Sequence, residues 1–189
     1  MTISSNRQLT RKLRLVVTLV ILCTCVGCDQ ATKQLATQRL RNAPAHSFLA
    51  DCLRFEYALN PGGFLSLGST LPDGVRTSAF ILLNSGLLMA LTVFLIMKRG
   101  LTLPLFVALA FILAGGIGNL IDRVWQNGLV TDFIVVGIGP LRTGVFNVAD
   151  MAVTFGAIAV ACLSLRQSSS SSGEPQSLEA LSSDTRVEE

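Results

Sequence analysis

The sequence is poor in the residues that common catalytic and metal sites require. It has one histidine, His46, in 189 residues, and its five cysteines are an odd number, four of which lie in or beside apolar runs. Zinc sites draw on several His and Cys side chains, and Ser-His-Asp or Cys-His catalysis needs a positioned histidine. We therefore expect no metal and no cofactor, and any catalysis must use carboxylates, Lys, Arg or Ser.

Charged residues are scarce as well. Asp, Glu, Lys and Arg make up 14% of the chain, against about 25% in a typical soluble domain, while half of the residues are hydrophobic. The net charge of +3 comes without a basic stripe, and one Trp and one Tyr offer no stacking platform, which excludes nucleic acid as a partner. The composition indicates one domain covered by lipid.

Four apolar stretches approach the roughly 20 residues that a helix needs to cross a bilayer. Three of them are long enough on their own, residues 79–97, 101–121 and 144–165. The first, residues 15–28, spans only if its helix continues past Asp29 to Lys33. We therefore expect an all-α membrane protein, with a bundle of four transmembrane helices over residues 15–165.

Four spans place both termini on one side of the membrane. Basic residues flank the spans on that side, in the segment 1–14, at Lys98 and Arg99, and at Arg166. Since cytoplasmic loops carry an excess of Lys and Arg, we expect both termini in the cytoplasm. The Ser-rich segment 166–189 cannot bury a core and predicts a disordered cytoplasmic tail.

The opposite side carries two longer segments, roughly 34–76 and 122–143, which contain strand-like patterns. The second half of 48–59 alternates between apolar and polar residues, and the turn signal Asn60-Pro61-Gly62-Gly63 follows it. Residues 130–136 also resemble a strand. We expect a small β element on the extracytoplasmic surface.

Polar residues gather at the outer ends of three spans. Their i, i+3 and i, i+4 spacings place each group on one helix face, and residues 115–118, Gly-Gly-Ile-Gly, would let the third span pack closely against a neighbour. If the spans form a bundle, the groups meet at one level. They comprise Asp29, Lys33, Asn119, Asp122, Arg123, Asn147 and Asp150, with Asp132 on the strand between.

Asp150 lies about one turn inside the last span, where an ionised carboxylate is costly. One interpretation is an ion pair with Arg123 that only joins helices. The other is a carboxylate pair with Asp132, since two carboxyls about 3 Å apart share one proton. The ionised member would take a proton from an attacking water while the protonated member hydrogen-bonds an amide carbonyl.

The polar residues fall in five blocks that occur in order. They are Asp29-Gln30-Ala31-Thr32-Lys33, Asn60-Pro61-Gly62-Gly63-Phe64, the run from Gly115 to Arg123, the run from Gly128 to Ile134, and Phe146-Asn147-Val148-Ala149-Asp150. In these blocks the chain resembles the lipoprotein signal peptidase (signal peptidase II) family over about residues 15–165. Five blocks on a four-span plan make the resemblance specific.

The resemblance implies an aspartic endopeptidase with Asp132 and Asp150 as its catalytic residues. Supporting or substrate-binding roles fall to Asp29, Lys33, Asn60, Asn119, Asp122, Arg123 and Asn147. Asn60 and Phe64 lie one residue closer together than the family pattern has them. The implied substrate is a prolipoprotein whose Cys carries diacylglyceryl, cut just before that Cys at the outer face of the bacterial cytoplasmic (inner) membrane. Membrane lipid is the other expected partner, and a monomer is expected.

Two other interpretations stay open. The basic residues 7–14, the apolar run after them and Cys25-Val26-Gly27-Cys28 are similar to a lipoprotein signal peptide, with Cys28 as the lipidated residue. Alternatively, a small transporter or channel subunit could use Asp29, Asp122 and Asp150 as a proton path, although transport sites usually lie near the midplane of the bilayer.

Overall fold

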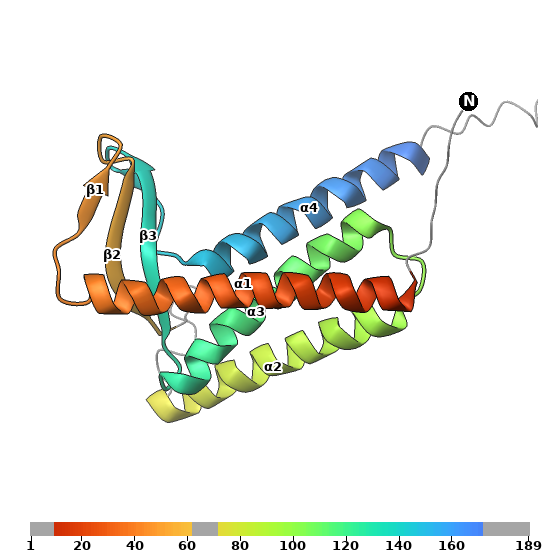
Figure 1. The fold of residues 1–189 in the computed structure, drawn as a ribbon, viewed down its shortest axis with the longest axis horizontal. Helices are drawn as coiled ribbons and strands as arrows, with labels where there is room; N and C mark the ends of the chain where they lie inside the picture. Colours follow the sequence, from red (N-terminus) through yellow and green to blue (C-terminus); the bar gives the residue numbers. More distant parts are fainter. Residues whose placement is uncertain (1–9, 62–71, 172–189) are drawn as a thin grey trace, which may run out of the picture.

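The computed structural model describes residues 10–61 and 72–171. Four long helices lie together, and a small sheet stands at one end of them (Figure 1). Within the described residues, all four helices are long and apolar enough to cross a membrane. The predicted fold class, a bundle of four spans with a small β element, is confirmed. The predicted turn at Gly62 and Gly63, the family position Phe64 and the end of the chain from residue 172 lie outside the described residues.

Helix α1 (Arg11–Leu40) is one continuous helix of 30 residues. Its N-terminus is capped by Thr10, whose Oγ1 accepts a hydrogen bond from the Leu13 N–H at 3.3 Å. At 1.5 Å per residue the helix is about 45 Å long, which exceeds the ~30 Å hydrocarbon core. It therefore continues through Asp29 and Lys33, as the first span requires. The helix also begins inside the predicted segment 1–14, because the basic residues there are good helix formers.

The second and third helices are longer than the apolar runs that predicted them. Helix α2 (Asp73–Met97) starts six residues before the predicted run. Helix α3 (Leu103–Trp125) has a proline in its first turn, where the missing N–H costs nothing. It continues past the predicted end at residue 121, so Asp122 and Arg123 belong to the helix rather than to the outer segment.

Helix α4 (Val148–Ser171) begins four residues later than predicted. The residues before it pair with the sheet instead: the Phe146 N–H donates to Ile134 O at 2.9 Å, and Phe146 O accepts from the N–H groups of Phe133 and Ile134 at 3.0 and 2.9 Å. At its other end the helix continues to Ser171, beyond the predicted tail boundary at residue 166. The rest of the predicted tail lies outside the described residues.

Helix α3 is the centre of the bundle and contacts each of the other three helices. Gly115 lies where an added Cβ would collide with the backbone oxygen of Ala149 in α4. At Gly118 an added Cβ would lie 2.7 Å from Oδ2 of Asp29 in α1. The prediction that residues 115–118 permit close helix packing is confirmed.

The sheet is antiparallel with strand order β1-β2-β3-β4. Its strands are β1 (His46–Phe48), β2 (Leu53–Asn60), β3 (Val130–Ile138) and β4 (Leu141–Arg142). Strands β2 and β3 confirm the two strand predictions. The register shifts between Phe55 and Ala58, after which Ala58 pairs with Asp132. This places the last residue of β2, Asn60, diagonally across from Asp132.

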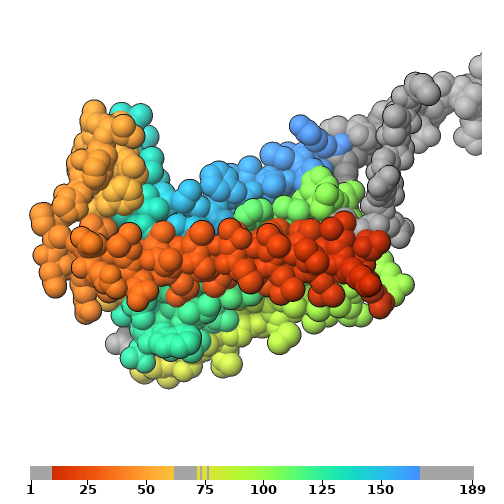
Figure 2. All heavy atoms as spheres, in the orientation of Figure 1, coloured from red at the N-terminus to blue at the C-terminus, as the bar shows by residue number. Residues whose placement is uncertain are grey.

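The outside of the bundle is apolar. Figure 2 shows the helices as one elongated body with the sheet at one end. Large apolar side chains that are more than half exposed include Leu19, Leu82, Leu87, Phe155 and Ile158. The cysteines of the spans are not all buried, since Cys23, Cys28 and Cys162 are exposed on the same surface. Lipid rather than water matches such a surface.

Candidate active site

Three charged side chains are buried together between α1 and α3. Lys33 Nζ lies 2.8 Å from Asp29 Oδ2 and 3.2 Å from Asp122 Oδ2, and it donates a hydrogen bond to Asn119 Oδ1 at 3.0 Å. Lys33, Asp29 and Asp122 are each less than 5% exposed. Buried charges need ion pairs and hydrogen bonds of this kind. The i, i+4 spacing of Asp29 and Lys33 supplies the first pair.

The two carboxylates of this cluster also hold backbone amides of other elements. Asp29 Oδ1 accepts a hydrogen bond at 2.8 Å from the N–H of Ala149, one of the amides in the first turn of α4 that have no partner within the helix. Asp122 Oδ2 accepts from the N–H of Thr131 in β3 at 2.9 Å. The cluster therefore fixes the start of α4 and the start of β3, the segments that carry Asp150 and Asp132.

Asn147 and Asp150 cap the N-terminus of α4. Asn147 Oδ1 accepts a hydrogen bond from the Asp150 N–H at 2.9 Å, and Asp150 Oδ2 accepts one from the Asn147 N–H at 3.2 Å. This reciprocal arrangement is a capping box. It holds the Asp150 carboxylate beside the first turn of α4, at the positive end of the helix dipole.

Asn147 also connects Asp150 to Asp132. Its Nδ2 donates a hydrogen bond to Asp132 Oδ1 at 2.6 Å. The other oxygen of Asp132, Oδ2, accepts from Asn60 Nδ2 at 3.0 Å, while Asp150 Oδ1 accepts from Asn119 Nδ2 at 2.8 Å. Asp132 is 1% exposed, whereas Asp150 is partly exposed. Two carboxylates from different elements are thus held by three asparagines.

The pKa of Asp132 is raised to about 6, chiefly because its carboxyl is buried. The hydrogen bond from Asn60 acts in the opposite direction, the negative charge of Asp150 raises the pKa, and the hydrogen bond from Asn147 lowers it. A carboxyl with such a pKa can hold a proton near neutral pH, as a general acid must.

Arg123 lies at the edge of this network. Its Nη1 donates to Asn119 O at 3.3 Å, and its Nε is buried without a hydrogen-bond partner. Among the described residues, no ion pair joins it to Asp150. The buried ion pairs that join these helices are those of Lys33 with Asp29 and Asp122, while Arg123 interacts with the charge of Asp150 at longer range, so a structural role for Asp150 stays a prediction.

The structure brings every residue predicted for the site into this one network or to its edge, although their roles stay predictions. Sequence reasoning missed two members. Gln30 Nε2 donates to Asp122 Oδ1 at 3.0 Å and to Asp29 Oδ2 at 3.2 Å, and Thr131 O accepts from Asn147 Nδ2 at 3.3 Å. Gln30 stands in the first sequence block beside Asp29, which is the signal that could have found it. The contact of Thr131 uses a backbone oxygen and leaves no such signal.

The fold and the site define a class: a membrane protein with four spans and a buried carboxylate cluster beside a small sheet. The sequence model of the family described as signal peptidase (SPase) II matches residues 20–166. This chain belongs to the signal peptidase II family. It is accordingly a multi-pass protease of a bacterial membrane that removes signal peptides from prolipoproteins.

Individual relatives agree with this assignment. The lipoprotein signal peptidase of Streptomyces griseus subsp. griseus is 31% identical over 143 residues, which are 73% of this chain and 67% of that one. The lipoprotein signal peptidase of Desulforapulum autotrophicum is 33% identical over 155 residues, 81% of this chain and 91% of that one. A bacterial membrane enzyme solved by the in meso method shares the fold, with a TM-score of 0.70 and 24% identity over 89% of this chain and 96% of that one.

Proposed function

We propose that the chain is an aspartic endopeptidase that cuts a diacylglyceryl-modified prolipoprotein just before its lipidated Cys. The observation that carries the proposal is the double role of Asn147, which hydrogen-bonds Asp132 through its side chain and Asp150 through its backbone. One residue thereby holds two carboxylates from different elements. The pKa of Asp132, raised by burial to about 6, supports a proton shared by this pair.

In the proposed reaction, a water between the carboxyls attacks the carbonyl carbon of the scissile amide. The ionised carboxylate accepts a proton from the water, and the protonated carboxyl donates its proton to the carbonyl oxygen, giving a gem-diol. The carboxyl that received the water proton then protonates the amide nitrogen, while the other carboxylate takes a proton from one hydroxyl as the C–N bond breaks. The pair again holds one proton, and no covalent intermediate forms.

Arg123 and Asn119 supply the groups that such a reaction needs around the catalytic dyad, which is the pair of carboxyls of Asp132 and Asp150. The buried Arg123 Nε has no hydrogen-bond partner, which suits a donor to a carbonyl of the substrate backbone. Asn119 bonds Asp150 through Nδ2 and Lys33 through Oδ1, so it relays the position of the buried ion pairs to the dyad. We assign Asp29, Lys33 and Asp122 to positioning, because they hold the segments that carry the dyad.

The basic residues support a definite orientation in the membrane. Arg11, Lys12 and Arg14 begin α1, and Lys98 and Arg99 follow α2, at the end of the bundle opposite the sheet (Figure 1). By the positive-inside rule this end and both termini face the cytoplasm. The dyad then lies near the extracytoplasmic surface, where both water and the lipidated Cys of a substrate reach it. All proposed catalytic groups come from one chain, which supports action as a monomer.

The two alternative functions agree less well with the contacts. If the chain were a lipoprotein cleaved before Cys28, it would lose the part of α1 that precedes Cys28. The next residue, Asp29, is buried in the bundle and bonded to Lys33 and Ala149, so the cleavage would fall beside a packed part of the structure. A proton path would need polar groups along the bundle. The opposite half of the described bundle instead has an apolar core that includes Phe106 and Leu113.

The test is cleavage of a diacylglyceryl-modified prolipoprotein by the full-length chain in liposomes, with both products identified by mass spectrometry. We expect Asp132→Asn and Asp150→Asn to abolish cleavage while leaving the protein inserted and folded. Glu56→Gln is the matched control, since it removes a carboxylate of the same sheet outside the network, and it should cleave normally. Near wild-type cleavage by either Asp variant would remove that residue from the dyad, and a cut elsewhere than before the Cys would refute the specificity.

A further inference from the structure

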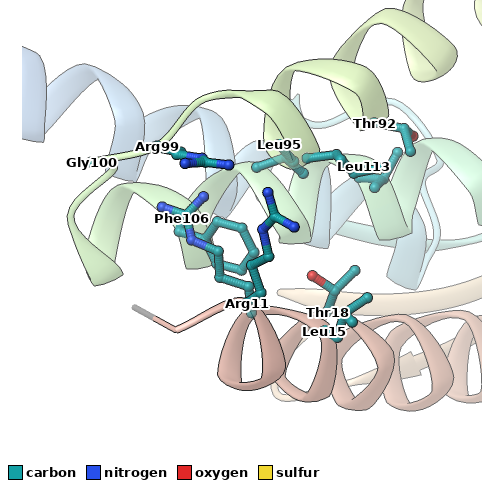
Figure 3. Close-up of a pocket in the computed structure, with 11 residues that line it drawn as sticks. Arg11, Leu15, Thr18, Thr92, Leu95, Arg99, Gly100, Phe106 and Leu113 are labelled. Carbon is teal, nitrogen blue, oxygen red and sulfur yellow. The ribbon is translucent and has the colours of Figure 1, made fainter. Parts of the chain in front are cut away.

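A second polar site lies at the end of the bundle opposite the sheet. A cavity of about 700 Å³ opens there between α1, α2 and α3. Three arginines line it: Arg11 and Arg14 from the start of α1, and Arg99 from the connection between α2 and α3. Figure 3 shows Arg11 and Arg99 on facing sides of this space, with the ring of Phe106 near both. None of the described residues that line this arginine cavity is acidic.

Arg14 is held in place yet incompletely bonded. Its Nη1 donates a hydrogen bond to Lys98 O at 2.8 Å, and its guanidinium lies over the ring of Phe106, 5.3 Å from the ring centroid. Its Nε is buried without a hydrogen-bond partner. A buried donor without a partner needs an explanation, and a planar guanidinium beside two further arginines matches the oxygens of a phosphate group.

Apart from Thr18, Thr92 and Gly100, the rest of the cavity lining is apolar, and it reaches the lipid-facing surface. Leu95 and Leu113 are buried in the core of the bundle, while Leu15 and Ile96 are 63% and 73% exposed on its outside. A ligand that fills the cavity therefore meets cations at one end and a hydrocarbon wall at the other. That pattern matches a molecule with a phosphate head and an acyl chain.

We propose that the arginine cavity binds an anionic phospholipid, with its phosphate between Arg11, Arg14 and Arg99 and an acyl chain along Leu15 and Leu95. Basic pockets between transmembrane helices on the cytoplasmic side bind anionic lipid headgroups in this manner. Charge disfavours two other occupants. Residues 1–9 of this chain contain Arg7 and no Asp or Glu, and the start of a signal peptide is itself positively charged.

The experiment is native mass spectrometry of the full-length chain in detergent, titrated with phosphatidylglycerol or with phosphatidylcholine of the same acyl chains. The variant Arg11→Gln/Arg99→Gln changes two exposed side chains, so folding is not at risk. The control Lys12→Gln/Lys98→Gln removes the same charge from the same end, outside the lining. We expect phosphatidylglycerol to bind preferentially, to bind about tenfold more weakly to the arginine variant, and to bind normally to the control. Arg14→Gln, which removes the unpartnered donor, should weaken binding similarly.

Four outcomes would overturn the proposal. Equal binding of the two lipids would show that the net negative charge of the headgroup does not contribute to binding, since phosphatidylcholine is neutral overall. Equal loss in the lysine control would show that general surface charge attracts the lipid. Displacement of the lipid by inorganic phosphate at comparable concentration would show a free-anion site to which the acyl chain adds nothing. A gain in lipid binding when residues 2–9 are deleted would also contradict it, because that segment would then be the occupant of the cavity.

Discussion

Asn147 and Asp150 each accept a hydrogen bond from the backbone amide of the other at the start of α4. The carboxylate of Asp150 is also a member of the proposed catalytic dyad, so the hydrogen bonds that begin the helix also position a reacting group. Because the capping box needs both side chains, the stability of this helix end and the geometry of the site are coupled. Substitutions that separate the two effects can test the coupling.

The substitution Asn147→Ser separates the helix cap from the hydrogen bond to Asp132. Serine retains an oxygen that can cap the helix, but it lacks the amide that donates to Asp132. Because the buried acceptors lose this donor, we expect a loss of about 1–3 kcal/mol of stability and of about 100-fold in kcat/KM, the scale expected when a reacting group is displaced by about 1 Å. Asn147→Ala should lose the same activity and in addition about 1 kcal/mol of stability. A serine variant with wild-type kcat/KM would show that the link to Asp132 is dispensable.

Gly118→Ala tests how closely α1 and α3 must approach. The added Cβ would lie 2.7 Å from Asp29 Oδ2 and 3.2 Å from Ala149 Cβ, so it would push Asp29 away from the start of α4. We expect a destabilisation of about 1–3 kcal/mol and reduced cleavage, measured by thermal unfolding in detergent and by the liposome assay. Gly27→Ala is the control, since an added Cβ there meets nothing within 4 Å and should be neutral or stabilising. Equal stability of the two variants would contradict this account.

The parts of the fold that follow from local pattern could be predicted from the sequence. Apolar length identifies the spans because the bilayer sets one requirement for each of them. Helical spacing put Asp29 on one face with Lys33, and this pair is buried as an ion pair. The polar residues of the site could be predicted for the same reason, since a bundle brings the outer ends of its helices to one level.

Contacts that use the backbone could not be predicted in this way. The hydrogen bond from the Ala149 N–H to Asp29 leaves no trace in the side-chain pattern. The pairing of Phe146 with Ile134 delays the start of α4. The length of an apolar run does not reveal this pairing, because it depends on a partner elsewhere in the chain. The choice of Lys33 over Arg123 as the partner of buried carboxylates depends on which helix faces meet, and spacing alone does not determine that.

Lys33→Gln should be among the most destabilising single changes of charge in the chain. It leaves Asp29 and Asp122 buried without their cation, and breaking a buried ion pair in this way costs about 3–5 kcal/mol. We expect a large fall in the unfolding temperature and in the yield of folded protein. Lys12→Gln, at an exposed position of the same helix, should unfold as the wild type does. Similar unfolding temperatures for the two variants would show that the cluster adds little to stability.

The pH dependence of cleavage follows from Asp132. Its pKa is raised by burial to about 6, so the free enzyme loses the shared proton as the pH rises through this value. We expect kcat/KM, which reports on the free enzyme, to fall about tenfold per pH unit above about pH 6. The apparent value belongs to the pair of carboxyls rather than to one of them. Stability changes in the same direction: the native state binds the proton more tightly than the unfolded chain, so this contribution is lost as the pH rises from about 4 to 6.

Asn60→Ala should shift the fall in kcat/KM above about pH 6, the basic limb of the pH profile, to higher pH. The hydrogen bond from Asn60 to Asp132 Oδ2 lowers the pKa of that carboxyl, so its removal raises the pKa further and retains the proton over a wider range. The measurement is the pH profile of kcat/KM for cleavage of the lipidated prolipoprotein. Glu56→Gln, outside the network, should leave the limb where it is. A variant at position 60 that loses activity uniformly at all pH values would assign Asn60 to substrate binding or to folding instead, and a limb that moves to lower pH would contradict the hydrogen bond as the cause.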